Sequence, residues 1–483
     1  MPPVTELTAG AARVAAPALP RIATTQRVVL AVLALTAVTF LLPSAPTYDP
    51  WAWIVWGREV LHLDLSTTAG PSWKPLPVLL TTPFSLFGPL APDLWLFAAR
   101  AATLAGVVLI FRVVRRLGGG VVGGTAAATA YALAPWTVRN GLMGNSEGLL
   151  VALALAAVDR HLAGARRQAF AFGLGCALLR PEAWPLFAAY GLWLLWRDRR
   201  AALGYVLAGG ALLPVLWLLP ELWGSGDLLR AAHRAHAPNA DSAAFADNPV
   251  VEVLHDFANM VTPVAWAGVA ALVVVVLARR RTSHPLRREV RGAAALAAIG
   301  VIWVAEVAYM TNDGFSGNAR YLIMPAAIVC LLGGLGLGWL VAALPRLRSA
   351  TGPAMFALTA LAALAVGVPT AVGVPDAIRG VTYQSRLTDG VGPAIEQAGG
   401  AAALRRCGNA YTGPFQVPAV AWHLRVHTSR VTSLRPPAAP AVVLRTANAR
   451  GGPVAPALDS LGGEAGVRTV SIANGWRIVE RCA

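Results

Sequence analysis

Long apolar stretches recur along most of this chain, and they constrain its fold more than any other feature. The hydrocarbon core of a bilayer is about 30 Å thick and takes about 20 apolar residues of helix to cross. The sequence has eleven stretches near this length, at 27–45, 93–114, 121–138, 147–163, 167–180, 183–197, 201–219, 261–278, 292–310, 321–343 and 353–374. Only 13% of the residues are charged, where a soluble protein has roughly 25%. We therefore predict an all-α polytopic membrane protein of about eleven transmembrane helices.

The basic residues indicate the orientation, because Lys and Arg accumulate in cytoplasmic loops. With the N-terminus inside, the cytoplasmic segments hold half of the 40 basic residues and four acids, Glu6, Asp159, Asp198 and Glu289. The net charge of +16 is then a topology signal, and no nucleic-acid partner is expected. This orientation requires the proline-rich stretch 76–90 to form an outer-surface juxtamembrane helix. The prediction is a multi-pass plasma-membrane protein with an extracytoplasmic C-terminus.

The chain divides into three parts by composition. We expect a cytoplasmic tail at 1–26, a transmembrane domain at 27–374 with a first outer loop at 46–92, and an extracytoplasmic domain at 375–483. The last part is rich in Gly, Pro and Arg, and its alternating pieces at 441–446 and 467–473 predict strands, hence a small α/β domain.

The four cysteines fall into two groups. Cys407 and Cys482 lie on the oxidising side of the membrane, where a disulfide persists, and we expect them to form one. Cys176 and Cys330 lie within predicted helices and are expected to be inert apolar residues.

The first outer loop holds the residues most suited to chemistry. Asp49 directly follows the first apolar segment, where a carboxylate is costly unless it is solvated or paired. It is a candidate catalytic base, and the alternative is a helix N-cap followed by Pro50 at the first helical position. Lys74 is the one lysine among the basic residues, and its compact ammonium suits a phosphate. The alternative for Lys74 is a lysine that snorkels to the membrane interface.

Further ionisable residues map to the same outer side of the membrane. They are Glu147, Arg180, Glu182, Glu306 and Arg320. Ionisable groups at membrane depth indicate a functional site. The alternative is a set of structural ion pairs, of which Arg180 with Glu182 or Glu147 is the first expected.

The order of these residues resembles a known family. Asp49, the pair Arg58-Glu59, Asp64 and the pair Lys74-Pro75 are similar to the first loop of the GT-C superfamily of membrane glycosyltransferases. The lipid A aminoarabinose transferases, protein O-mannosyltransferases and actinobacterial arabinofuranosyl and mannosyl transferases are similar in layout. Pro50 and Leu76 depart from the pattern, since the family often has a second acid and a second proline there.

The resemblance covers about 45–345. It includes an acid before the fourth span (Glu147), Arg180-Pro181-Glu182 between two short spans, and Arg320-Tyr321 at the start of the tenth span.

The resemblance implies an inverting glycosyltransferase with a polyprenyl-phosphate sugar as lipid donor and a glycan, glycolipid or protein as acceptor. The sugar is expected to be mannose or arabinofuranose, transferred on the extracytoplasmic side. Asp49 would be the general base and Glu147 the second choice, while Lys74, Arg320 and Arg180 would hold the donor phosphate. The expected substrate-binding residues are Trp53, Arg58, Glu59, Asp64, Trp73, Glu182 and Tyr321. The tail after 375 resembles nothing recognisable.

Two alternatives to this function stay open. A transporter or flippase of lipid-linked glycans would line its path with similar charges, although no internal repeat of the transporter type is visible. A scaffold of envelope assembly would need no base. No cofactor and no metal site are predicted; His233 and His236 have metal-type spacing on a helix, but no third ligand with good spacing follows.

Overall fold

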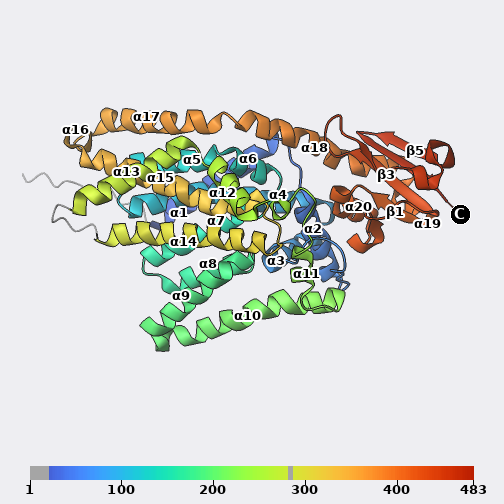
Figure 1. Cartoon of the computed structure of the whole chain (residues 1–483), viewed down its shortest axis with the longest axis horizontal. Coiled ribbons are helices and arrows are strands. Elements are labelled where there is room, and N and C mark those ends of the chain that lie inside the picture. Colours follow the sequence, from blue (N-terminus) through green and yellow to red (C-terminus); the bar gives the residue numbers. More distant parts are fainter. Residues whose placement is uncertain (1–20, 281–286, 483) are drawn as a thin grey trace, which may run out of the picture.

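The computed structural model describes residues 21–280 and 287–482. Most of the long helices run side by side, and a small sheet lies at one end of the molecule beside the C-terminus (Figure 1). The greater part of the predicted tail 1–26, with Glu6, falls outside the described residues.

Each of the eleven predicted apolar segments is helical. The helices are α1 (Arg21–Val38), α4 (Ala91–Arg116), α5 (Gly120–Ala132), α7 (Glu147–Leu162), α8 (Arg166–Ala177), α9 (Trp184–Arg197), α10 (Arg199–Ser225), α13 (Pro263–Arg280), α14 (Arg287–Asn312), α15 (Ile323–Ala343) and α17 (Gly352–Ala371).

Not every one of these helices is long enough to cross a bilayer. By length and composition, the described chain has five helices that could cross, or up to seven if two sharply bent helix pairs each count as one span. Helices α5, α8 and α9 have 13, 12 and 14 residues, or about 18–21 Å at 1.5 Å per residue. Eleven complete crossings therefore stay a prediction.

Shorter helices connect the long ones. They are η1 (Thr39–Leu41), α2 (Tyr48–Leu61), α3 (Pro75–Phe84), η2 (Ser85–Leu90), α6 (Pro135–Leu142), η3 (Pro181–Ala183), α11 (Arg230–Ala235), η4 (Ala243–Phe245), α12 (Pro249–Met260), η5 (Ala319–Leu322) and α16 (Pro345–Arg348). The bent pairs are α6 with α7, at 114°, and α12 with α13, at 93°. The stretch 76–90, predicted as a helix, is helical in α3 and η2.

Helix α15 forms the centre of the bundle and is buried along most of its length. Its glycines let neighbouring backbones approach. A Cβ at Gly336 would lie 2.0 Å from the carbonyl oxygen of Gly268 in α13, and one at Gly338 would lie 2.0 Å from that of Gly119, just before α5. Small residues give membrane helices this close packing, and α15 thereby fixes the position of η5 at its N-terminal end.

The C-terminal part combines three helices with a six-stranded sheet. The elements are α18 (Val374–Gln397), α19 (Gly400–Cys407), β1 (Asn409–Thr412), η6 (Pro414–Gln416), α20 (Val417–Leu424), η7 (Thr428–Arg430), β2 (Val431–Thr432), β3 (Ala441–Ala447), β4 (Val454–Ala455), η8 (Asp459–Leu461), η9 (Gly463–Gly466), β5 (Arg468–Ala473) and β6 (Trp476–Arg481). The strand order is β2-β1-β3-β6-β5, with β4 on β3. Strands β1 and β2 are parallel, and α20 is the crossover that parallel pairing needs.

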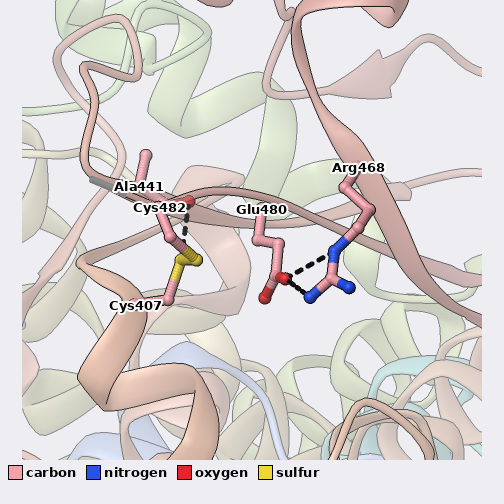
Figure 2. Close-up of a disulfide and its surroundings, with 5 residues drawn as sticks. All are labelled: Cys407, Ala441, Arg468, Glu480 and Cys482. Atoms are coloured by element: carbon pink, nitrogen blue, oxygen red, sulfur yellow. Dashed lines mark hydrogen bonds and ion pairs between the residues drawn. A yellow bond between two sulfur atoms is a disulfide. The ribbon is translucent and has the colours of Figure 1, made fainter.

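The predicted strands at 441–446 and 467–473 correspond to β3 and β5. A disulfide joins Cys407, at the end of α19, to Cys482, just after β6 (Figure 2). The ion pair between Arg468 and Glu480 lies beside it.

Candidate active site

Several helix starts meet where the predicted site residues lie. Asp49 is in the first turn of α2, and Lys74 directly precedes α3, whose first residue is Pro75. Glu147 is the first residue of α7, and Arg320 lies in η5, which leads into α15. Because helix N-termini carry unpaired N–H groups and a partial positive charge, this arrangement favours bound anions.

Backbone and side-chain hydrogen bonds bring Asp49 close to Glu147. Thr47 donates from its hydroxyl to Asn145 Oδ1 at 2.6 Å and from its amide to the carbonyl of Met143 at 3.3 Å. Thr47 is two residues before Asp49, and Asn145 is two before Glu147. The segments that lead into α2 and α7 are therefore held together.

The ionisable side chains form a row of alternating charge. Lys74 Nζ is 3.9 Å from Asp49 Oδ2, and Arg320 Nη2 donates to the same oxygen at 2.5 Å. Arg320 Nε is 3.9 Å from Glu147 Oε1. Asp49 thus contacts two cations, and Arg320 lies between two carboxylates.

The row continues beyond Glu147. Arg180 donates to Glu147 and lies 3.6 Å from Glu182 (Nη1 to Oε1), so both ion pairs expected from the sequence are present. The guanidinium of Arg180 also lies over the ring of Tyr321, with its Cζ 4.3 Å from the ring centroid. The structure therefore brings Lys74, Arg320 and Arg180 together in one buried cluster.

Burial and charge set the protonation of the two residues in the first loop. Lys74 and Asp49 are each 8% exposed. Burial and the charge of Arg180 lower the pKa of Lys74 to about 7. Burial alone would raise the pKa of Asp49, but the nearby Arg320 and Lys74 outweigh it and hold that pKa below its usual value. At neutral pH Asp49 is ionised, and Lys74 gives up its proton more readily than a lysine in water does.

Several buried polar atoms at this site have no hydrogen-bond partner among the described residues. They include Glu147 Oε2, Glu182 Oε2, Arg320 Nε and Trp53 Nε1. The Trp53 ring lies below Lys74, whose Nζ is 5.2 Å from the ring centroid. Because buried polar groups are almost always paired, these atoms are available to bound water or to a polar ligand.

The capping alternative for Asp49 is wrong. Helix α2 begins at Tyr48, its N-cap is Thr47, and Asp49 is the second helical residue. The Asp49 carboxylate instead contacts Lys74, which is buried, and Arg320, which is partly buried. Such cations need a counter-charge.

Four of the expected substrate-binding residues have partners within the protein. Arg58, about two and a half turns along α2 from Asp49, donates to two carbonyls at and just after the end of α20, at 3.3 and 2.8 Å. Trp73 donates to a carbonyl of α10 at 3.0 Å. Glu59 and Asp64 both contact His427, at 2.8 and 3.2 Å. The contacts of Arg58, Glu59 and Asp64 attach the C-terminal part to the first loop. The substrate-binding role of these four residues stays a prediction.

His427 did not emerge from the sequence, and no local pattern could have identified it. The two histidines with metal-type spacing have separate partners, since His233 pairs with Asp227 at 2.8 Å and His236 lies 3.9 Å from Asp313.

Comparison with known proteins supports the architecture. No protein-family model matches the chain, and no curated protein matches it in sequence. The structure of ArnT from Cupriavidus metallidurans bound to undecaprenyl phosphate is similar over 95% of this chain and 97% of that one, with a TM-score of 0.58 and 14% identity. The apo state of the same protein covers 95% and 98%, with a TM-score of 0.58 and 15% identity.

The apo oligosaccharyltransferase of Archaeoglobus fulgidus is more distant, with a TM-score of 0.47, 13% identity, and coverage of 83% of this chain and 64% of that one. At such identities a structural likeness shows the fold and nothing more. The chain therefore shares the fold of ArnT from Cupriavidus metallidurans.

Proposed function

We propose that the protein is an inverting glycosyltransferase that moves a sugar from a polyprenyl-phosphate donor to a glycan, lipid or protein acceptor on the extracytoplasmic face. The observation that carries this proposal is the contact of one carboxylate, Asp49, with two cations, Lys74 and Arg320. A base for a hydroxyl and cations for a departing phosphate are then adjacent. ArnT, whose fold the chain shares, has been solved with undecaprenyl phosphate bound, which supports a lipid phosphate as the ligand.

In the proposed reaction the acceptor hydroxyl attacks the anomeric carbon of the donor. Asp49 takes the hydroxyl proton as general base. The bond from the anomeric carbon to the phosphate oxygen breaks, and its electron pair leaves with the polyprenyl phosphate. The configuration at the anomeric carbon is inverted. Lys74, Arg320 and Arg180 stabilise the negative charge of the leaving group in a buried site, where such charges interact strongly.

The remaining site residues have supporting roles in this proposal. Trp53, Glu182 and Tyr321 line the charged row and bind the sugar, and Glu147 is the second candidate base. The sugar is mannose or arabinofuranose. The transmembrane domain is 27–374, with its N-terminus in the cytoplasm, and the extracytoplasmic domain is 375–483.

The experiment is a transfer assay with the purified protein in nanodiscs. Labelled decaprenyl-phosphate mannose and decaprenyl-phosphate arabinose are offered in turn with candidate acceptor glycans, and the anomeric configuration of the product is determined. Transfer with inversion supports the proposal. A protein that moves the intact labelled lipid across a liposome membrane, but never cleaves it, is a flippase and contradicts the proposal.

A further inference from the structure

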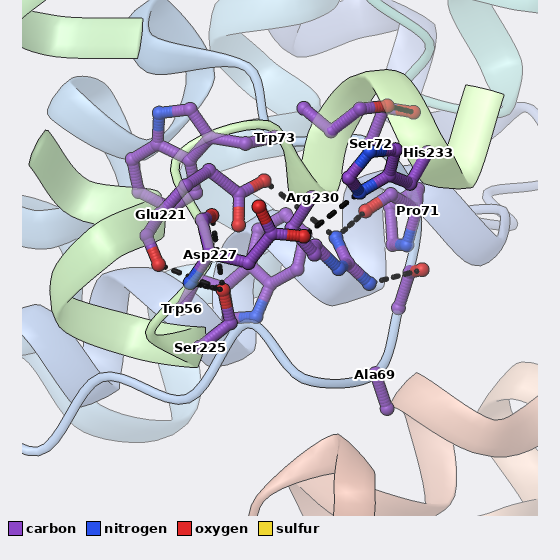
Figure 3. Close-up of polar contacts among 12 residues, drawn as sticks. Trp56, Ala69, Pro71, Ser72, Trp73, Glu221, Ser225, Asp227, Arg230 and His233 are labelled. Atoms are coloured by element: carbon purple, nitrogen blue, oxygen red, sulfur yellow. Dashed lines mark hydrogen bonds and ion pairs between the residues drawn. The ribbon is translucent and has the colours of Figure 1, made fainter. Parts of the chain in front are cut away.

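The loop that carries Lys74 is fastened to a distant part of the chain. Residues 66–74 run beside the end of α10 and the start of α11 (Figure 3). The amide of Thr67 and the ring N–H of Trp73 donate to carbonyls of α10, both at 3.0 Å. The hydroxyl of Ser72 donates to a carbonyl of α11 at 2.9 Å. The backbone position of Lys74 therefore depends on these two helices.

Arg230, the first residue of α11, makes the central contacts to this loop. Its Nη1 and Nη2 donate to the carbonyls of Pro71 and Gly70, at 2.5 and 2.9 Å (Figure 3). The same Nη1 is 3.7 Å from Glu221 of α10, whose side chain is 0% exposed. Glu221 thus supplies the counter-charge that a largely buried guanidinium requires, while the planar fork bridges two successive carbonyls. A lysine has a single ammonium and cannot reproduce this geometry.

We propose that Arg230, neutralised by Glu221, is a positioning residue that holds the 66–74 loop so that Lys74 meets the lipid phosphate beside Asp49. This inference rests on the proposed function. Lys74 has a flexible stem of four carbons, so a loop that moves would leave its ammonium in several places. Fixing the loop confines the ammonium to the phosphate site and lowers the entropy lost when the ligand binds.

The test measures the affinity of the full-length protein in nanodiscs for undecaprenyl phosphate, with undecaprenol as the ligand without phosphate. Arg230→Lys keeps the charge opposite Glu221 but loses the bridge, and we expect about tenfold weaker binding of undecaprenyl phosphate. Arg234→Lys is the matched control, because Arg234 is in the same helix and donates to the carbonyl of Ala237 in its own segment. Unchanged affinity in Arg230→Lys overturns the inference.

A double mutant separates positioning from general support of the fold. If Arg230 acts through Lys74, Arg230→Lys causes no further loss of affinity in a Lys74→Ala background. Equal losses in both backgrounds overturn the inference. Ser72→Ala, which removes a single hydrogen bond of the same loop, is the second variant should Arg230→Lys fail to fold. We expect a two- to threefold loss of affinity for undecaprenyl phosphate, and no loss in a Lys74→Ala background. A wild-type protein that binds undecaprenol as tightly as undecaprenyl phosphate contradicts the proposed function itself.

Discussion

Arg320 donates a hydrogen bond to Asp49 across 271 positions of sequence, with 2.5 Å between Nη2 and Oδ2. The same oxygen lies 3.9 Å from Lys74 Nζ. A phosphate bound by these two cations competes for them with the Asp49 carboxylate. We therefore expect donor binding to weaken the interaction of Lys74 and Arg320 with the Asp49 carboxylate. Because less positive charge then stabilises its ionised form, Asp49 should be a stronger base when the acceptor hydroxyl binds.

Asp49→Asn separates binding from chemistry. The amide cannot take a proton, so transfer should fall by about 10²- to 10⁴-fold, the usual contribution of a general base. Affinity for undecaprenyl phosphate should stay equal or rise, because the phosphate no longer competes with a carboxylate for Lys74 and Arg320. The control is Asp376→Asn, at an exposed ion pair with Arg379. Transfer near the wild-type rate would reject Asp49 as the base.

Lys74 should make ligand binding depend on pH. Burial lowers the pKa of Lys74 to about 7, so above pH 7 the free protein holds mostly the neutral amine, and a bound phosphate must draw a proton onto it. Affinity for undecaprenyl phosphate should therefore fall as the pH rises from 7 to 9. Lys74→Arg stays charged throughout this range, so its affinity should lack this fall.

Lys74→Ala should weaken donor use more than Lys74→Arg does. Affinity for undecaprenyl phosphate is measured against pH at constant ionic strength for both variants and the wild type. Any pH dependence that all three share comes from titration of the ligand phosphate. Identical pH profiles for wild type and Lys74→Arg would contradict the assignment, and equal donor use by the alanine and arginine variants would point to packing.

The substitution Glu147→Gln tests whether Asp49 or Glu147 is the general base. It is 1% exposed and contacts Arg180 and Arg320 through one oxygen. If Asp49 is the base, Glu147→Gln should reduce kcat far less than Asp49→Asn does, by about tenfold, because it alters only the placement of the cations. The reverse order of the two kcat values would transfer the role of base to Glu147.

The sequence predicted the elements of this fold better than their contacts. Helical segments and the strands at 441–446 and 467–473 follow from local apolar patterns, and all of them are present. Apolar length alone could not distinguish a complete span from a shorter helix such as α8, with 12 residues. Eleven predicted crossings thus compare with five helices in the described parts of the chain that are long and apolar enough to cross, or seven spans if each bent pair counts as one.

The site shows the same limit. Asp49, Lys74 and Arg320 were singled out by residue type and position, because ionisable groups are costly at a membrane surface. The pairing of Asp49 with Arg320 depends on the tertiary placement of η5 near the start of α2, and no local pattern encodes it. Local preference even favoured a capping role for Asp49, which the buried cations override. His427 and the pair of Arg230 with Glu221 were missed for the same reason.

The disulfide between Cys407 and Cys482 closes a loop with a sequence separation of 75. Such a loop stabilises the folded state by about 4 kcal/mol in the chain-entropy model. Cys407→Ser should therefore loosen the C-terminal sheet, seen as faster amide exchange in β3 and β6, and leave exchange in α15 unchanged. Identical peptide maps of the wild type with and without reductant would show that no such bridge forms.

Gly57→Ala tests whether the close contact of α2 with α3 sets the geometry of the site. A Cβ at Gly57 would lie 2.5 Å from Thr81 Oγ1 and 2.6 Å from the Thr81 backbone carbon, so α3 must move. Thr81 also donates to the carbonyl of Trp53 at 2.7 Å, a buried bond that this movement would strain. We expect a loss of about 1–3 kcal/mol in stability. We also expect weaker binding of undecaprenyl phosphate, because Lys74 directly precedes α3 and Asp49 lies in the first turn of α2. Gly210→Ala in α10 is the matched control, since a Cβ there meets nothing within 4 Å. If Gly57→Ala has the same melting temperature and lipid affinity as Gly210→Ala, the site tolerates a shift of α3. The contact at Gly57 then does not determine the position of Lys74.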